Sequence, residues 1–265
     1  MAESGTSGGA LLRTLRASRH RTQQWTELEA DLGSGYLQRL ESGRVAQPSR
    51  LTVERILAAL EARFIESRTI LEAFGYRASA SLPTETERAW ARAEVQGALD
   101  AARFPAYALD CTARLVAWNA YLPRLIDLGP QDPLPRQMTE RSLLFAWFDA
   151  RTPLGATVRE QAAFDLAMTH AFRAELQRFS QEAWPAQMVH DLKALPRFRE
   201  AWTRVAAEPP PLNASRASVP MSLQVAAVGQ LAFRLAAEPF ALDPRFRTVH
   251  LFPADSATIE WCEST

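Results

Sequence analysis

The stretch "AYALDCTARLVAWNA", residues 106–120, decides the fold of the larger part of the chain. Two short apolar runs flank a small polar segment, which predicts two strands around a turn near Cys111–Ala113. The second strand is expected to run from Arg114 to Trp118. Three more strands are expected near the end of the chain, in residues 221–228, 230–238 and 248–254.

Helical patterns occupy the sequence between these strands and just before them. They cover residues 89–102, 141–150, about 156–179, 184–195 and 197–206, and a loop is expected at 208–215. Two strands, a helical middle and three strands suit a five-stranded antiparallel sheet with inserted helices, an arrangement similar to that of PAS-like sensor domains. Asn119, directly after the second strand, is expected to cap the helix that follows.

The first 75 residues have a different character and predict short helices only. Apolar stripes at helical spacing lie in residues 11–15, 51–60 and 65–74, and Gly43 stands where a helix C-cap glycine belongs. Gly75 ends this block, and the polar Ser, Thr and Pro residues after it are typical of a linker. The predicted fold class is therefore α+β, with an all-α five-helix domain over 1–75, a linker over 76–85 and a PAS-like domain over 86–265.

Composition excludes several classes of protein. The chain has 265 residues, 47% of them hydrophobic and 23% charged, with a net charge of zero, so it is a folded protein and not a polycation. Cys111 and Cys262 are far apart and give neither a disulfide framework nor a metal-ligand spacing, which favours a reducing compartment. The first ten residues are small and polar, and no apolar run reaches the roughly 18 residues of a membrane span. We therefore expect a cytoplasmic protein without membrane contact.

A helix-turn-helix pattern runs from Thr22 to Leu40. Thr22-Gln23 opens one helix, Tyr36-Leu37 and Leu40-Glu41 belong to the next, and Gly43 and Pro48-Ser49 follow in order. These residues resemble the Xre family, the lambda-repressor type, over roughly residues 8–75. The resemblance implies a five-helix domain that binds double-stranded DNA. The alternative is a helical bundle without DNA contact.

The proposed recognition helix should bury Leu37 and Leu40, which lie three residues apart, and expose its other side to base edges. Arg39 can offer a bidentate fork to guanine, and Gln38 can pair with adenine or a phosphate. Gln23 and Arg44 are placed for the DNA backbone. The candidate DNA-binding residues are Gln23, Ser34, Gly35, Gln38, Arg39 and Arg44.

The sequence departs from the Xre pattern at two places. Thr26-Glu27 stands where the family usually has Leu-Ala, and a glutamate is awkward where two helices cross closely. Trp25 and Leu28 are expected to supply the lost apolar contacts through a rotated helix. Asp31 replaces a frequent turn glycine and tolerates the left-handed conformation better than most residues.

The small net charge of the N-terminal residues predicts that two copies of the chain bind DNA together. Residues 1–55 carry eight arginines and six acidic residues, a net charge of +2, so a single copy should bind DNA weakly and a homodimer is expected.

A second resemblance covers the rest of the chain. Phe104-Pro105-Ala106, Trp118-Asn119, the helix at 141–150 and "FREAW" at 198–202 are similar to the ligand-binding domain of MmyB/MltR-type regulators, which also follows an Xre module. The family's His-Pro before the third strand is replaced by "SVP", residues 218–220. The resemblance implies a small hydrophobic ligand, with fatty acids as the leading class.

Aromatic and methionine side chains on the predicted helices suit such a ligand. The candidate ligand-binding residues are Trp118, Phe145, Phe148, Phe164, Met168, Phe172 and Met188. The same side chains also suit an ordinary core, and Trp118 is compatible with a structural role alone. Arg114, Arg159 and Arg173 are the candidates for pairing with a carboxylate head group, and the sequence does not rank them.

Three functions remain open at this point. The chain is a DNA-binding regulator that senses a hydrophobic effector, or one whose C-terminal domain only dimerises, or an enzyme. The enzyme is the weakest, because there is no metal or nucleophile motif and the four histidines are scattered. No cofactor and no metal are expected, although haem or flavin with His170 or His190 as ligand is an alternative. An enclosed apolar cavity would favour sensing, and a solid core would favour dimerisation.

Overall fold

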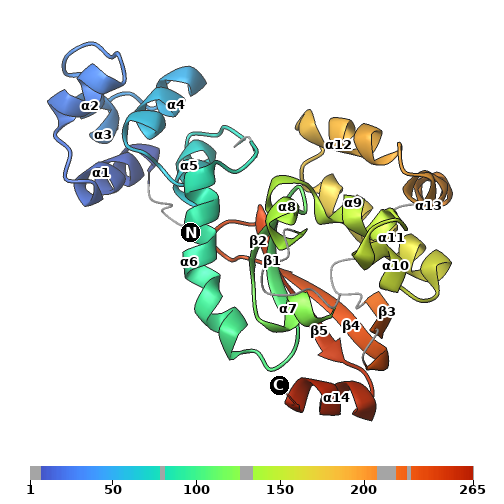
Figure 1. Cartoon of the computed structure of the whole chain (residues 1–265). Helices are drawn as coiled ribbons and strands as arrows, with labels where there is room; N and C mark the ends of the chain where they lie inside the picture. Colours follow the sequence, from blue (N-terminus) through green and yellow to red (C-terminus); the bar gives the residue numbers. More distant parts are fainter. Residues whose placement is uncertain (1–6, 78–80, 126–133, 208–218, 226–227, 265) are drawn as a thin grey trace, which may run out of the picture. The chain divides into compact units, whose positions relative to one another are not determined.

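The computed structural model describes residues 7–77, 81–125, 134–207, 219–225 and 228–264. The chain forms two compact units, residues 1–80 and 81–265. Figure 1 labels their helices and strands. The predicted loop at 208–215 and residues 78–80 of the predicted linker lie outside the described residues.

The first unit is all-helical. Its helices are α1 (Gly8–Ser18), α2 (Gln23–Glu29), α3 (Tyr36–Glu41), α4 (Arg50–Ala59) and α5 (Phe64–Ala73). Three of them begin at a Ser or Thr whose hydroxyl accepts a backbone N–H three residues further on: Ser7, Thr22 and Ser49. The predicted five-helix domain is confirmed.

Residues of the predicted apolar stripes form much of the core of the first unit. Leu12, Leu40, Val53 and Ile56 are completely buried, and Leu37 is 1% exposed. Helix α1 approaches α3 so closely that a Cβ atom on Gly9 would lie 2.2 Å from the carbonyl oxygen of Leu40. This close crossing requires glycine and fixes α3 against α1.

The second unit contains a five-stranded sheet. Its strands are β1 (Ala106–Asp110), β2 (Leu115–Trp118), β3 (Val219–Val225), β4 (Gly229–Pro239) and β5 (Phe246–Pro253). They pair antiparallel in the order β2-β1-β5-β4-β3, with Tyr107 opposite both Trp118 and Val249. The two strands at residues 106–120 and the three near the end of the chain are confirmed.

Helices cover the two faces of this sheet differently (Figure 1). Helix α6 (Glu85–Ala101) packs on one face of β1 and β2, where small residues such as Ala106, Ala108 and Ala117 allow close contact. The other face packs against a helical layer that includes α9 (Leu143–Phe148), α11 (Gln161–Gln177) and α13 (Pro196–Ala206). The remaining helices are α7 (Tyr121–Arg124), α8 (Leu134–Glu140), α10 (Pro153–Thr157), α12 (Trp184–Leu192) and α14 (Ser256–Glu263).

Two local expectations about the second unit are wrong, and one helix was not expected. The long helix expected over about 156–179 is interrupted, because Val158 pairs with Leu223 of β3 and Glu160 has a left-handed φ of 50°. Helix α14 follows the last strand, capped by the side chain of Asp255, and no pattern predicts it.

The second error concerns Asn119, which does not cap a helix. Its buried side chain accepts a hydrogen bond from the backbone N–H of Ala106 at 3.2 Å. Its amide group donates to the carbonyl oxygens of Leu99 and Phe104 at 3.1 and 2.8 Å. Asn119 therefore joins the end of α6 to the start of β1. This position satisfies more backbone groups than a helix cap would.

Candidate functional site

The turn between α2 and α3 sets the direction of α3. Asp31 has a left-handed φ of 52°, as expected for this replacement of glycine. Gly35 is the N-cap of α3 and has a φ of 73°, a conformation that side-chain-bearing residues rarely adopt. Because glycine has no side chain, α3 lacks a cap of its own.

Helix α3 buries one side and exposes the other. Leu37 and Leu40 face the core, while Gln38 and Arg39 are exposed. Ser34 and Arg44, on either side of the helix, are exposed as well, and Gly35 is half-buried. These positions agree with the orientation predicted for a recognition helix.

A buried carboxylate ties α2 to α3 and to α1. The side chain of Glu41 is 3% exposed and accepts hydrogen bonds from Arg16 Nε at 2.7 Å and Gln23 Nε2 at 2.6 Å. The hydrogen bond with Glu41 raises the pKa of Arg16. Gln23, the first residue of α2, is thus held in place by its own side chain.

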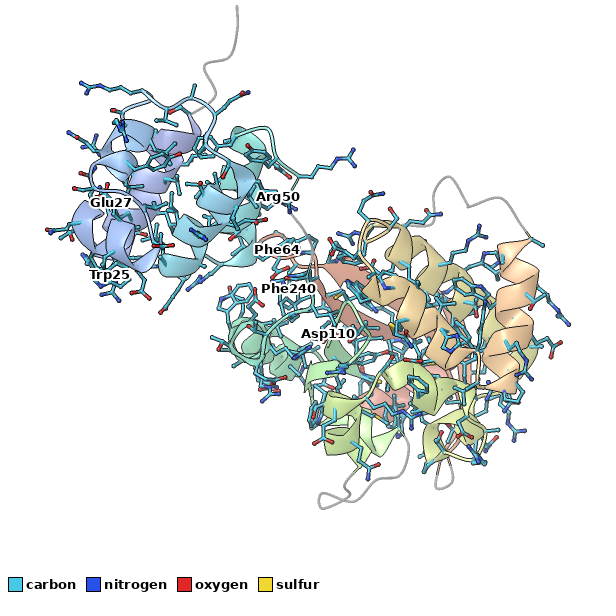
Figure 2. All side chains as sticks on the ribbon, turned by 90° about the horizontal axis from the view of Figure 1, so that it is seen from above. Trp25, Glu27, Arg50, Phe64, Asp110 and Phe240 are labelled. Atoms are coloured by element: carbon cyan, nitrogen blue, oxygen red, sulfur yellow. The ribbon has the colours of Figure 1, made fainter. Side chains whose placement is uncertain are left out.

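Glu27 corrects the expectation of a rotated helix. Figure 2 labels it beside Trp25 on α2. Its carboxylate is buried and accepts the backbone N–H of Gly35 at 3.1 Å and of Leu37 at 2.8 Å. Leu28 is 81% exposed and supplies no core contact. Glu27 therefore caps α3 from the neighbouring helix, which explains a charged side chain where the Xre pattern has a small one.

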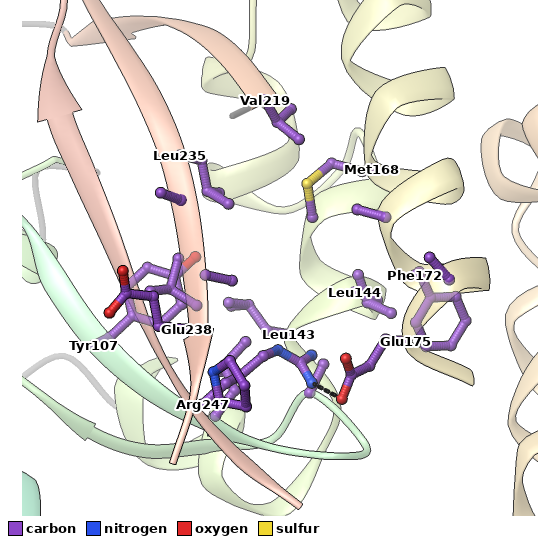
Figure 3. Close-up of a pocket in the computed structure, with 18 of the residues that line it drawn as sticks. Tyr107, Leu143, Leu144, Met168, Phe172, Glu175, Val219, Leu235, Glu238 and Arg247 are labelled. Atoms are coloured by element: carbon purple, nitrogen blue, oxygen red, sulfur yellow. Dashed lines mark ion pairs between the residues drawn. The ribbon is translucent and has the colours of Figure 1, made fainter. Parts of the chain in front are cut away.

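The second unit contains a pocket between the sheet and α11. Its volume is about 880 Å³. Side chains from β1, β4 and β5 form one wall, and side chains from α9 and α11 form the other, as Figure 3 shows for Leu143, Met168 and Phe172. Most of the wall is apolar, and Tyr107, Glu175, Arg178, Glu238 and Arg247 add polar groups.

Two charged side chains face each other in this pocket (Figure 3). Nη1 of Arg247, on β5, lies 3.5 Å from Oε1 of Glu175, on α11, and both side chains are mostly buried. Nη1 of Arg178 lies 3.3 Å from the other oxygen of Glu175. Nη1 of Arg247 and Nε1 of Trp147 are buried without a hydrogen-bond partner in the described part of the chain. Such donors are expensive unless a further group accepts from them.

Burial raises the pKa of two groups at opposite ends of β1, Tyr107 near its start and Cys111 directly after its end. It raises the pKa of the Tyr107 hydroxyl above its ordinary value, against a smaller opposing effect of Arg247. It also raises the pKa of the Cys111 thiol to about 12. Both groups are therefore neutral at physiological pH.

Residues 91–263 match the MmyB-like transcription regulator ligand-binding domain. The chain belongs to this family. The match covers all five strands, α11 and the pocket residues between them. It identifies the second unit as the ligand-binding domain of a transcription regulator. A comparison with curated proteins gives no match.

The MmyB-like domain places the predicted ligand residues in different surroundings. Met168 and Phe172 line the pocket. Phe148 and Phe164 belong to the buried core, and Trp118, Phe145 and Met188 pack against that core, but these five are outside the pocket lining. Helical spacing selects the six that lie on helices, because a helix that faces a core and a helix that faces a cavity have the same apolar stripe. Trp118 lies on β2 and was suggested by the MmyB/MltR resemblance.

The arginines suggested as carboxylate partners are also outside the pocket lining of the MmyB-like domain. Arg159 donates to Gln224 on β3, and Arg173 donates to the carbonyl oxygen of Val205 on α13. Arg114 is half-buried, and its backbone N–H donates to Asp110. Arg247 lines the pocket instead.

A sequence signal for Arg247 and Glu175 exists. Along β5, Arg247 has the same phase as the buried residues Val249 and Leu251, so it points toward the core. Glu175 lies three residues after Phe172 and seven after Met168, on the same side of α11. A charge at an inward position of a strand or helix needs a partner, and that requirement marks both residues.

The described residues also include possible metal ligands and apolar helices. In the described part of the MmyB-like protein, no group of three or more His, Cys, Asp or Glu residues is arranged to hold a metal ion. His170 is half-buried and His190 exposed, on different helices, and neither lines the pocket. Across the described ranges, no helix is long and apolar enough to cross a membrane.

Proposed function

We propose that this protein is a homodimeric transcription regulator that binds double-stranded DNA through residues 1–80 and a hydrophobic effector through residues 81–265. The observation that carries the proposal is the pocket of about 880 Å³ inside the MmyB-like domain. A volume of roughly 300–1,000 Å³ is typical of small-molecule sites. A domain that only dimerises has no need of such a cavity, so the pocket supports sensing over dimerisation.

The effector is an amphipathic molecule with an acyl chain and an acidic head group, such as a fatty acid. Apolar side chains such as Leu144, Met168 and Phe172 form much of the wall. Each buried CH₂ group of a chain contributes about 0.8 kcal/mol, so about ten of them supply the 8 kcal/mol of micromolar binding. Arg247 lines the pocket and would pair with the acidic head group.

The DNA-binding part of the proposal rests on α3. Gln38 and Arg39 are exposed on a helix whose other side is buried, as recognition by side chains requires. Glu27 accepts from the first turn of this helix, and Arg16 and Gln23 donate to its last residue, Glu41, so its position is defined before DNA binds. Two copies on one operator share the electrostatic work of a domain with few basic residues.

The effector regulates DNA binding by favouring one arrangement of the two DNA-binding units in the dimer. It does so only to the extent that it binds one arrangement more tightly than the other. The same coupling requires that operator DNA change the affinity for the effector by the same factor.

A thermal-shift experiment tests effector binding. Fatty acids of 8 to 18 carbons should raise the melting temperature of the full-length protein, with stabilisation that follows ln(1 + [L]/Kd). Ala174→Trp, which fills the pocket, should abolish the shift. Ala163→Trp, at an exposed position of the same helix outside the pocket lining, should retain it. No shift with any chain length in the wild-type protein contradicts the sensing function.

Selection from a pool of random DNA duplexes tests DNA binding independently. The full-length protein should enrich a sequence with two related half-sites, since a dimer presents two copies of α3. An enriched single half-site would contradict the dimer. No enrichment at low salt would leave residues 1–80 as a helical bundle without DNA contact.

A further inference from the structure

The position of Glu175 suggests how the pocket discriminates between head groups. Glu175 lies between two arginines, with Oε1 toward Arg247 and Oε2 toward Arg178. The side chains of Arg247 and Glu175 are 14% and 17% exposed, whereas that of Arg178 is 39% exposed. One carboxylate thus connects a cation inside the pocket with a cation at its rim.

The inner ion pair is poorly made. A charge-assisted hydrogen bond has a length of about 2.7–2.9 Å, but Arg247 and Glu175 are 3.5 Å apart. Nη1 of Arg247 also has no hydrogen-bond partner within the described ranges. A mostly buried pair with this geometry does not recover the cost of removing both charges from water. An acceptor that reaches Arg247 directly therefore gains more than it would in a well-paired site.

We propose that Glu175 occupies Arg247 in place of the ligand, and that an anionic head group displaces it toward Arg178. This inference rests on the proposed effector pocket and assigns its selectivity between head groups to the exchange at Arg247. Arg247 exchanges a loose internal partner for a bidentate external one. Glu175 keeps its contact with Arg178, where water also solvates it.

The exchange explains selectivity against neutral and cationic lipids. A neutral head group leaves the loose ion pair unchanged and adds little to the contacts of its chain. A cationic head group places a third positive charge between Arg247 and Arg178. Glu238 also lines the pocket, but its side chain is exposed and water screens its charge. Selectivity should therefore depend on Glu175 and Arg247 and not on the total charge of the pocket.

Three probes with the same chain length test this inference on the full-length protein: dodecanoate, dodecan-1-ol and dodecylammonium, each titrated by calorimetry below its micelle concentration. The wild-type protein should bind dodecanoate about tenfold or more tighter than dodecan-1-ol, the size expected of a hydrogen bond to a charged group. It should bind dodecylammonium more weakly than the alcohol.

Matched variants separate the roles of the two residues. Arg247→Gln should reduce the affinity for dodecanoate to that of the alcohol and leave the alcohol unchanged. Glu175→Gln removes the internal competitor and should tighten dodecanoate binding by about tenfold, again without effect on the alcohol. Glu238→Gln removes the same charge from the rim and should change either affinity by less than about twofold.

Each outcome has a definite meaning. The inference is overturned if wild-type protein binds the alcohol as tightly as the carboxylate, or if Glu175→Gln weakens or does not change dodecanoate binding. The proposed pocket function still stands in both cases, because a ligand binds. If no probe binds to the wild-type protein, the pocket function fails, and the inference fails with it.

Discussion

Glu27 offers the most direct test of how the first unit presents α3. Its carboxylate accepts the backbone N–H of Gly35 and of Leu37, the first groups of a helix whose N-cap is a glycine. Glu27→Ala removes this acceptor and installs the small residue that the Xre pattern usually has. If Glu27 were only a misfit, alanine would stabilise the domain.

The structure predicts that Glu27→Ala destabilises the domain. Leu37 is 1% exposed, so its N–H loses its partner without access to water, which costs about 1–3 kcal/mol. The N–H of half-buried Gly35 is rehydrated in part, and the loss of a helix N-cap costs about 0.5–2 kcal/mol. Together we expect a loss of about 2–3 kcal/mol. For a domain of this size that corresponds to a decrease in melting temperature of about 10 °C or more.

The assay is thermal and urea unfolding of a fragment of residues 1–80, which forms a compact unit with its own core. Trp25 is its single tryptophan and lies on α2, so its fluorescence reports on the region of interest. Glu29→Ala, at an exposed position of the same helix, is the control and should change stability by less than about 0.5 kcal/mol. A Glu27→Ala variant as stable as this control, or more stable, would refute the capping role.

Three further predictions concern DNA binding, acid stability and thiol reactivity. Arg39→Ala should weaken specific DNA binding by about 1–3 kcal/mol and relax the preference at one base position, whereas Arg44→Ala should weaken all sequences alike in salt-controlled shift assays. Burial opposes ionisation of Glu87, but hydrogen bonds from the backbone of Thr84 and from Arg245 lower its pKa overall. The ionised carboxylate therefore stabilises the fold above its ordinary pKa of 4.5, and this stabilisation is lost as the pH falls. Glu87→Gln should make the free energy of unfolding depend less on pH in the acid range. Cys111, with a pKa of about 12, should react with thiol reagents at pH 8 only after denaturant is added.

Much of the fold could be predicted from the sequence because residues close together along the chain determine many of its helices and strands. The two strands at residues 106–120 flank a short turn, and the N-terminal helices begin at Ser or Thr caps. The exposed and buried sides of α3 follow from the three-residue spacing of Leu37 and Leu40. In each case neighbours along the chain determine the outcome.

The wrong predictions concern residues whose structure depends on contacts with residues far away in the sequence. The sequence around Val158 has a helical pattern, but Val158 forms an antiparallel β-bridge with Leu223, which lies 65 residues further on. Asn119 contacts backbone groups on α6 and β1 instead of its own helix. All candidate ligand residues except Trp118 follow from helical spacing, and spacing cannot tell which part of a core is left hollow.

Charges at inward positions carry the information that the apolar pattern lacks. A buried charge is costly, so the fold must supply a partner for each one. Glu27 has backbone N–H groups, Asp110 has Arg88 together with backbone and hydroxyl donors, and Arg245 has Asp243 and Glu87. Arg247 differs from these three, because one of its N–H groups has no acceptor in the described chain and its ion pair is loose. A side chain that the fold buries without completing its contacts is where a partner from outside gains most, and in this protein that side chain faces the pocket.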